Sequence, residues 1–487
     1  MRDRPIELDP EAFRALGHGL VDRLADFLAS LPGRRVHPGD GVGALREALG
    51  GAGLPEHGED PAAVLEAAEG FVLDHSLFNG HPRFMGYITS SAAPLGSLAD
   101  LLASTVNPNC GGFSLSPAGT LIEEQVIRWM AELVGMPAGT GGLLVSGGNM
   151  ANMVAFWAAR AARAGRDVRS AGVAGGAPLT AYCSAETHTW IQKAADLSGL
   201  GTAAIRWIPA DGGQRMRVGE LAARIGADRA AGAQPFLVVG TAGTVSTGAV
   251  DPLPEIAALC RREGLWFHVD GAYGAPAVIA DGTPEDLAGM AAADSVAVDP
   301  HKWLYAPLEV GCTLVRDPAA LAGAFSYHPD YYHFEEPSEE TPPNYYELGP
   351  QNSRGFRALK VWMGLRQAGR HGYALMIADD IRLAGELYAL AAAHPELEAV
   401  TTHLSITTFR YVPAGADRAG DPAALNALNE RLLERLQQSG RAFVSNAVVD
   451  GRFLLRACIV NFRTDREDLQ ALVDAVVDIG RALSLRV

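Results

Sequence analysis

A strand, a helix and a second strand follow one another within residues 235–270, and this unit limits the folds open to the chain. The strand PFLVVGTA leads into DPLPEIAALCRREG, a helix that begins after Asp-Pro and ends at Gly264, and LWFHVD follows. Two strands joined by a helical crossover pair in parallel. The segments GGLLVSGG, TAYCSAE, AAIRWIPAD and SVAVDP read as further strands. We therefore predict an α/β fold, a mainly parallel sheet with helices on both faces.

The 487 residues are predicted to form three regions. Residues 1–95 are expected to be a helical segment whose first, amphipathic helix packs on its own domain or covers a partner subunit. Residues 96–370 are expected to form the large α/β domain, with a long loop at about 326–353. Residues 371–487, where helices and strands are mixed, are expected to form a smaller α+β domain.

The charge and cysteine content disfavour several classes of function. The formal net charge of -16 repels nucleic acid and anionic membranes. Five cysteines lack the spacing of a zinc site or a disulfide framework, so we expect reduced thiols and no metal. The acidic N-terminus and the lack of an apolar run of about 18 residues disfavour secretion and membrane insertion. We expect a cytoplasmic protein without a nucleic-acid or membrane partner.

Polar groups are predicted at one edge of the sheet, because ligands of open α/β sheets bind beyond the carboxyl ends of the strands. GLLV is followed by Ser-Gly-Gly-Asn, FLVV by GTAGT, LWFHV by Asp270, and SVAV by Asp-Pro-His-Lys. Each alone has an ordinary explanation, such as a helix cap for the glycine turn or a solvated loop for the lysine. Together they place a glycine turn, hydroxyls, a carboxylate and a lysine at successive strand ends.

Three of these groups predict the chemistry of pyridoxal 5'-phosphate. Gly148 and Asn149 open a helix whose free N–H groups can bind a phosphate. A buried Asp270 needs a cation or hydrogen-bond donors, and a protonated pyridine nitrogen is such a cation. Burial of Lys302 favours the neutral amine that forms a Schiff base. The combination is the one expected for pyridoxal phosphate.

Longer segments resemble a known family. The group II pyridoxal-phosphate-dependent amino-acid decarboxylases, which are aromatic-L-amino-acid decarboxylase-like enzymes, are similar to SVAVDPHKWL, LWFHVDGAYGAPAV, VSGGNMANMVAFWAAR, CSAETHTWIQKAADLSGLG, NCGGFSLSPAGTLIEEQVIRWM and RGFRALKVWMGLRQAG. The similarity runs from the first helix to LRACIVNFRTDREDL, nearly the whole chain. It implies the aspartate-aminotransferase type of fold, fold type I, with a mostly parallel seven-stranded sheet. It also implies an intertwined homodimer whose active sites draw on both subunits.

The resemblance implies roles for individual residues. Lys302 forms the Schiff base with the cofactor, and Asp270 pairs with the ring nitrogen. His188 stacks on the ring face, and Ala272 flanks the ring. The implied cofactor contacts are Gly148, Asn149, His188, Thr244, Asp270, Ala272, Asp299, His301 and Lys302. The implied substrate contacts are Tyr87, Ser90 and His188.

The loop at about 326–353 is acidic, proline-rich and aromatic, and it is longer than a structural connection needs. It is either an inert solvated loop or a mobile lid that excludes water from the cofactor. The resemblance implies that Tyr345 returns a proton to the carbon that has lost carbon dioxide. Tyr346 is the adjacent rival for this role.

Two positions depart from the family pattern. Val245 stands where many relatives carry a threonine near the cofactor, so that contact is lost or passes to Thr244 or Ser246. The segment from Tyr87 to Ser90 differs from the aromatic-proline pattern of the animal aromatic decarboxylases. The identity of the substrate is therefore open.

We predict that the chain decarboxylates an L-amino acid, with an aromatic or other apolar side chain favoured, to an amine and carbon dioxide. The predicted catalytic residues are Lys302, His188, Tyr345 and Asp270. Decarboxylation coupled to oxidative deamination, which gives an aldehyde, is one alternative, and an aminotransferase is another. A non-covalent nucleotide-binding α/β protein, in which the glycine turn holds a phosphate, is an alternative of a different class.

Overall fold

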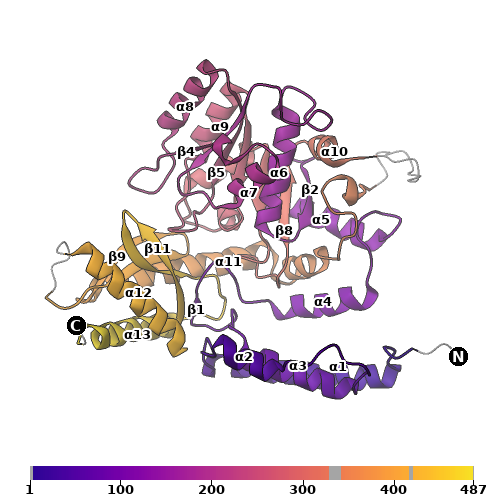
Figure 1. Cartoon of the computed structure of the whole chain (residues 1–487), viewed down its shortest axis with the longest axis vertical. Helices are drawn as coiled ribbons and strands as arrows, with labels where there is room; N and C mark the ends of the chain where they lie inside the picture. Colours follow the sequence, from indigo (N-terminus) through magenta and orange to yellow (C-terminus); the bar gives the residue numbers. More distant parts are fainter. Residues whose placement is uncertain (1–3, 328–341, 416–420, 486–487) are drawn as a thin grey trace.

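The computed structural model describes residues 4–327, 342–415 and 421–485. Residues 328–341 of the predicted lid lie outside the described residues. Figure 1 shows the large sheet with its helices, a second sheet near the C-terminus and a separate layer of N-terminal helices. The helices are α1 (Pro10–Ser30), α2 (Val42–Leu49), α3 (Pro61–His75), α4 (Pro94–Val106), α5 (Pro117–Leu133), α6 (Gly148–Arg163), α7 (Trp190–Leu197), α8 (Val218–Ala230), α9 (Leu253–Glu263), α10 (Ala319–Phe325), α11 (Ala358–Ala393), α12 (Pro422–Ser439) and α13 (Arg466–Ser484).

The large sheet has seven strands in the order β2-β8-β7-β6-β5-β3-β4. Its strands are β2 (Gly141–Val145), β3 (Leu179–Ser184), β4 (Ile205–Ile208), β5 (Gln234–Thr241), β6 (Trp266–Asp270), β7 (Ser295–Val298) and β8 (Gly311–Val315). β8 is antiparallel to both of its neighbours, and the remaining pairs are parallel. Every residue of β6 is buried, so helices cover both faces of the sheet. The predicted fold class is confirmed.

The predicted crossover is present as β5, α9 and β6. The two strands pair in parallel from Leu237 opposite Trp266 to Thr241 opposite Asp270. α9 ends because Gly264 adopts a left-handed conformation, with φ of 65°, and its N–H donates to the Cys260 carbonyl. The carboxyl ends of β5, β6 and β7 thus meet at one edge, where the site lies.

The second sheet has five strands in the order β1-β11-β12-β10-β9, and α12 and α13 pack on it. Its strands are β1 (Phe84–Met85), β9 (Leu397–His403), β10 (Ile406–Tyr411), β11 (Phe443–Val449) and β12 (Arg452–Cys458). β1 comes from the predicted N-terminal region and pairs in parallel with β11. α11 packs on both regions and is interrupted at Gly369, where φ is 64° and ψ 170°, next to the predicted boundary at 370.

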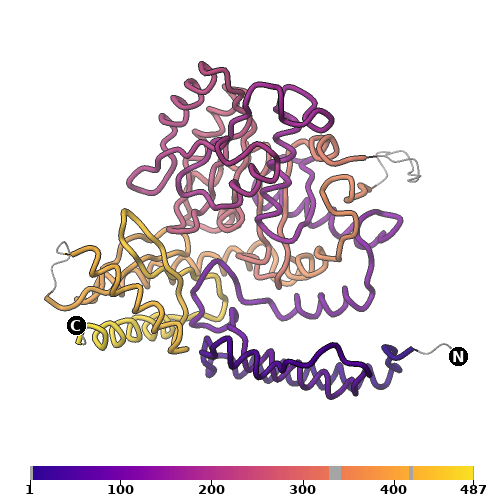
Figure 2. Tube along the Cα trace, in the orientation of Figure 1, coloured from indigo at the N-terminus to yellow at the C-terminus, as the bar shows by residue number. Residues whose placement is uncertain are grey.

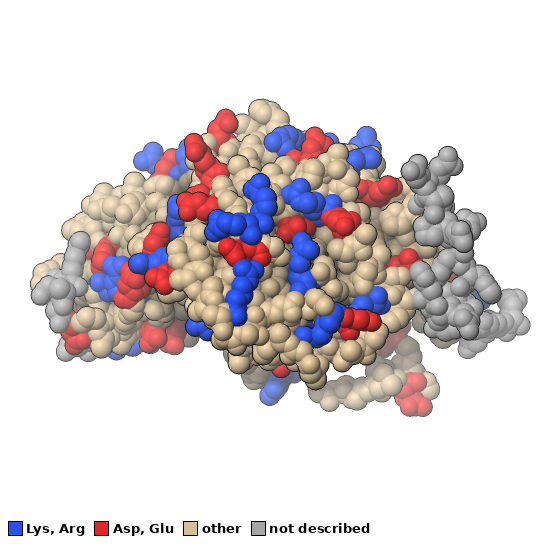
Figure 3. Space-filling view, turned by 90° about the horizontal axis from the view of Figure 1, so that it is seen from above, with Lys and Arg blue, Asp and Glu red and all other residues tan. Residues whose placement is uncertain are grey.

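The N-terminal helices form a layer apart from both sheets, as the trace in Figure 2 shows. α1, α2 and α3 bury none of their residues. An ion pair between Arg23 and Glu69 joins α1 to α3. Within the described ranges, no helix has the length and apolar character needed to cross a membrane. On the face shown in Figure 3, acidic and basic side chains are interspersed.

Candidate active site

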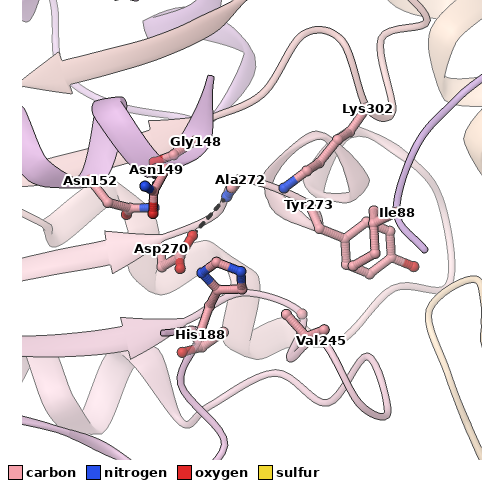
Figure 4. Close-up of a pocket in the computed structure, with 12 residues that line it drawn as sticks. Ile88, Gly148, Asn149, Asn152, His188, Val245, Asp270, Ala272, Tyr273 and Lys302 are labelled. Atoms are coloured by element: carbon pink, nitrogen blue, oxygen red, sulfur yellow. Dashed lines mark hydrogen bonds between the residues drawn. The ribbon is translucent and has the colours of Figure 1, made fainter. Parts of the chain in front are cut away.

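A cavity of about 420 Å³, counting its open mouth, lies at the carboxyl edge of the large sheet. It is lined by Ile88, Gly148, Asn149, Asn152, His188, Thr241, Gly243, Val245, Asp270, Ala272, Tyr273 and Lys302. Figure 4 shows the Lys302 amine and the His188 ring directed into the space beside Asp270. Six of the predicted site residues therefore share one cavity, namely Gly148, Asn149, His188, Asp270, Ala272 and Lys302.

Asp270 ends β6 and is 7% exposed. Its Oδ2 accepts a hydrogen bond from the Trp190 indole Nε1 at 2.8 Å, and its Oδ1 accepts one from the Ala272 N–H at 3.2 Å. Neither donor is charged, and a carboxylate can accept more than two hydrogen bonds. The Asp270 carboxylate is therefore oriented and still able to pair with a cationic N–H in the cavity.

The turn before α6 has the features of an anion-binding site. Gly147 has φ of 147°, and no side chain caps the helix that follows. A Cβ at Gly148 would overlap the Asp299 carboxylate and lie 2.9 Å from the Ala272 Cβ, so only glycine fits there. Uncapped N–H groups at a helix N-terminus favour a phosphate.

Lys302 lies in the turn after β7. Its Nζ is 3.0 Å from Asp299 Oδ2, and the lysine side chain is 20% exposed. Asp299 is almost fully buried, and its Oδ1 has no hydrogen-bond partner among the described residues. The Nε2 of His301 is 3.7 Å from the same carboxylate. The Lys302 ammonium and the Asp299 carboxylate therefore form an ion pair at the cavity wall.

His188 precedes α7 and faces the cavity. Its Nδ1 accepts the Trp190 backbone N–H at 3.2 Å, which leaves the proton of a neutral ring on Nε2. Burial lowers the pKa of His188, against a smaller opposing effect of the Asp270 charge. The ring is therefore neutral near pH 7, with an N–H available to a ligand.

Besides Asp299 and His301, three more predicted contacts lie outside the cavity lining. Thr244 is fully buried, and its hydroxyl bonds to Thr247 Oγ1 at 3.0 Å. Ser90 donates to the His301 carbonyl at 2.9 Å, and both residues line a neighbouring groove. Tyr87 is 53% exposed and packs against Phe443. Val245 does line the cavity, so the position that departs from the family pattern faces the site.

Tyr345, the predicted proton donor, is also away from the cavity. It is 1% exposed, and its ring lies 4.8 Å from the Arg354 guanidinium carbon. Arg354 is buried in an ion pair with Glu123 and donates to the carbonyls of Cys110 and Leu144. Burial raises the pKa of the Tyr345 phenol well above its usual value. The ring is enclosed because it covers this buried ion pair.

Several residues that line the cavity, or that bond to a residue lining it, were not predicted from the sequence. Trp190 holds Asp270, Asn152 lies one turn after Gly148, and Tyr273 stacks on Trp303 with ring centroids 4.9 Å apart. The spacing of Asn152 from Gly148 would have placed it on the same face of α6. Within the described ranges, no group of three or more His, Cys, Asp or Glu side chains is arranged to hold a metal ion.

Comparison with known proteins identifies the family. The family model of the pyridoxal-dependent decarboxylase conserved domain matches residues 46–412. An aromatic-L-amino-acid decarboxylase of Bacillus atrophaeus is 33% identical over 481 residues, which are 99% of this chain and 98% of that protein. The chain belongs to the pyridoxal-dependent decarboxylase family. The predicted family, the pyridoxal-phosphate cofactor and the carboxy-lyase activity on an amino acid are therefore confirmed.

Solved structures agree with this decarboxylase over its whole length. The structure of Oryza sativa TDC with PLP and tryptamine has a TM-score of 0.90 at 27% identity and covers 99% of this chain and 100% of that one. The structure of Rhodiola rosea 4-hydroxyphenylacetaldehyde synthase has a TM-score of 0.86 at 27% identity and covers 98% of this chain and 99% of that one. These likenesses confirm fold type I. The roles of individual residues stay predictions.

Proposed function

We propose that this decarboxylase acts on an L-amino acid with an aromatic or other apolar side chain and releases the amine and carbon dioxide. One observation carries the proposal: a single cavity combines the Lys302 amine, the Asp270 carboxylate and the glycine turn of α6. Ile88 and Val245 give the same cavity an apolar side. The name of the B. atrophaeus relative and the tryptamine in the O. sativa structure support an aromatic substrate.

The residues of the cavity fit pyridoxal phosphate. Gly148 and Asn149 would hold the phosphate with backbone N–H groups. Asp270 would pair with the protonated ring nitrogen, and His188 would lie against the ring. Lys302 would bond to the aldehyde carbon. When bound, the cofactor supplies an aldehyde that forms an imine with an amine, and a protonated ring that draws electrons from the substrate α-carbon.

The chain's own groups then account for orientation and proton transfer. The two N–H donors fix the Asp270 carboxylate, so its charge points into the cavity. The Nε2–H of His188 is available to bind the substrate carboxylate. The apolar side formed by Ile88 and Val245 disfavours a charged carboxylate and favours neutral carbon dioxide. The Lys302 ammonium, held by Asp299, is the acid we propose to return a proton to the α-carbon.

The proposed active form is a homodimer. Phe13 and Leu24 of α1 are 53% and 39% exposed, although α1 is amphipathic. Leu24 also lines an apolar groove between α1 and α4, together with Phe78 and Leu98. An exposed apolar groove is typical of a surface that another protein covers, which supports contact with a second subunit here. Light scattering is expected to give twice the chain mass, and Leu24→Asp is expected to shift the protein toward monomer.

Borohydride reduction tests the proposed role of Lys302. The chain has three lysines, at 193, 302 and 360, so a reduced pyridoxyl group can be mapped without ambiguity. We expect the visible band of the holoenzyme to disappear on reduction and the label to lie on Lys302. Lys302→Ala is expected to bind no covalent cofactor and to release no amine, while Lys193→Arg, on the exposed side of α7, is expected to match the wild type. A label on Lys193 or Lys360 would refute the assignment.

Product analysis tests the reaction. Amine, aldehyde, ammonia and peroxide are measured with each of the common L-amino acids, and we expect amine with aromatic or large apolar substrates. Aldehyde with ammonia and peroxide would instead favour the reaction named for the R. rosea neighbour. The five described cysteines are free and buried, which supports the proposed cytoplasmic location.

A further inference from the structure

A row of hydrogen-bonded polar side chains begins inside the core and reaches the cavity wall at Asn152. His268 is at its centre, in β6, two residues before Asp270. Its Nδ1 is 2.8 Å from Ser295 Oγ in β7, and its Nε2 is 2.7 Å from Asn152 Oδ1 in α6. The Asn152 Nδ2 donates to the Gly148 carbonyl at 2.8 Å. The row thus runs from the middle of the sheet to the glycine turn of α6.

The direction of each hydrogen bond in this row is determined. The Gly148 carbonyl can only accept, so the Asn152 amide nitrogen faces it and the amide oxygen faces His268. The Nε2 of His268 must therefore carry a proton and donate to Asn152 Oδ1. Ser295 Oγ accepts the Trp266 indole N–H at 2.8 Å and can then donate its own proton to Nδ1. A neutral ring with the proton on Nε2 satisfies every partner.

The surroundings keep the ring in this form. His268 and Ser295 are 0% exposed and Asn152 is 2% exposed, so water does not compete for these bonds. Burial lowers the pKa of His268 to about 4, so the ring is neutral at physiological pH. If the proton moved to Nδ1, Asn152 would lose its donor or would turn its oxygen toward the Gly148 carbonyl. The row therefore has one favourable arrangement.

His268 also packs on the residue that holds Asp270. The Trp190 ring lies edge to face with the His268 ring, with centroids 5.7 Å apart and planes at 86°. The indole N–H of Trp190 donates to Asp270. The His268 ring thus contacts both Asn152, which bonds to the Gly148 carbonyl, and Trp190, which bonds to the Asp270 carboxylate.

We propose that His268 is a positioning residue that fixes the glycine turn of α6 for the cofactor phosphate by donating from Nε2 to Asn152. The inference rests on the proposed placement of the phosphate at Gly148 and Asn149. His268 does not line the cavity, so it acts through Asn152 and not on the substrate. Loss of this one hydrogen bond is expected to weaken phosphate binding without changing the Schiff base.

Two substitutions of similar size separate this role from general packing. In His268→Gln the amide nitrogen lies near the position of Nε2 and can still donate to Asn152. In His268→Asn the shorter amide reaches only the position of Nδ1, so it keeps the contact with Ser295 and loses the one with Asn152. Both variants lack the imidazole ring, which makes each the control for the other. Unfolding temperatures of the apoproteins show whether both fold.

The measurement is the dissociation constant of each apoprotein for pyridoxal 5'-phosphate and for pyridoxal, which lacks the phosphate. We expect His268→Asn to bind pyridoxal 5'-phosphate about tenfold or more weakly, with pyridoxal unchanged, because one buried hydrogen bond of the cradle is lost. His268→Gln is expected to remain within about threefold of the wild type for both compounds. The visible band of the lysine imine is expected at the same wavelength in all three saturated proteins.

Two results would overturn the role of His268. One is an equal loss of affinity for both compounds in His268→Asn, and the other is an equal effect of the two substitutions on pyridoxal 5'-phosphate. A different result would contradict the phosphate placement itself, namely wild-type protein that binds pyridoxal as tightly as pyridoxal 5'-phosphate. The wild-type comparison therefore separates failure of the proposed site from failure of this inference.

Discussion

The position of Tyr345 gives a sharp prediction about the reaction product. The resemblance to the family implies that this tyrosine protonates the substrate from a lid, but its ring is enclosed over Arg354 and is 1% exposed. The substitution Tyr345→Phe removes the hydroxyl and keeps the ring. If the Tyr345 ring only packs over Arg354 and its hydroxyl donates no proton to the substrate, the variant still produces the amine.

The free-energy cost of moving Tyr345 into a site can be worked from its burial. A buried tyrosine ring removes about 200 Å² from water, which at about 25 cal/mol per Å² is about 5 kcal/mol. The contact with the Arg354 guanidinium adds about 1 kcal/mol. Release of the ring would therefore occur in fewer than about one molecule in 10⁴ at equilibrium. A residue that must donate a proton in every turnover would need its ring to be released far more often than this.

The assay measures amine, aldehyde and peroxide from Tyr345→Phe, Tyr345→Ala and Tyr346→Phe, together with thermal unfolding. We expect Tyr345→Phe to give amine with kcat within about threefold of the wild type and a change in stability under about 1 kcal/mol. Tyr345→Ala is expected to cost about 3–5 kcal/mol of unfolding free energy, because it leaves a cavity over the buried ion pair. Tyr346→Phe controls for loss of a neighbouring phenol. A switch of Tyr345→Phe from amine to aldehyde and peroxide would refute the reasoning.

Three further predictions concern other buried groups. Asp270→Asn is expected to keep the cofactor but lower kcat by about 10²-fold or more, measured as amine release, because it removes the charge that faces the ring nitrogen; an unchanged kcat would contradict that role. Trp190→Phe keeps the ring but removes the donor to Asp270, and kcat/KM is expected to fall about tenfold or more. Burial raises the pKa of the Asp380 carboxyl from 3.8 to about 7. Between these two pH values the folded state binds one more proton than the unfolded state. The free energy of unfolding therefore falls as pH rises through this range, by on the order of 1.4 kcal/mol per pH unit. Asp380→Asn is expected to flatten this slope in urea titrations at several pH values, whereas Asp474→Asn, at an exposed side chain bound by Gln470, is expected to leave it unchanged.

The sequence predicted the large sheet and the polar residues at its strand ends because both follow from local patterns. An apolar strand followed by Asp270 or Lys302 is visible without any knowledge of packing, and parallel strands bring their ends together. Trp190 and Tyr273 could not be assigned in the same way, because their functions depend on which ring or carboxylate the fold places beside them. The pairing of β1 with β11 joins residues far apart in the sequence, and no local pattern predicts such a partner.

The two aspartates at neighbouring strand ends show how tertiary contacts divide residues that look alike in the sequence. Asp270 and Asp299 each follow a buried strand, and each is almost fully buried. The donors to Asp270 are neutral N–H groups, so its charge is left for a cation that enters the cavity. Asp299 already has a cation, because Lys302 Nζ is 3.0 Å away, and its free Oδ1 is closed off from water. The Asp270 carboxylate is therefore able to pair with a cationic ligand, whereas the Asp299 carboxylate is already paired with Lys302.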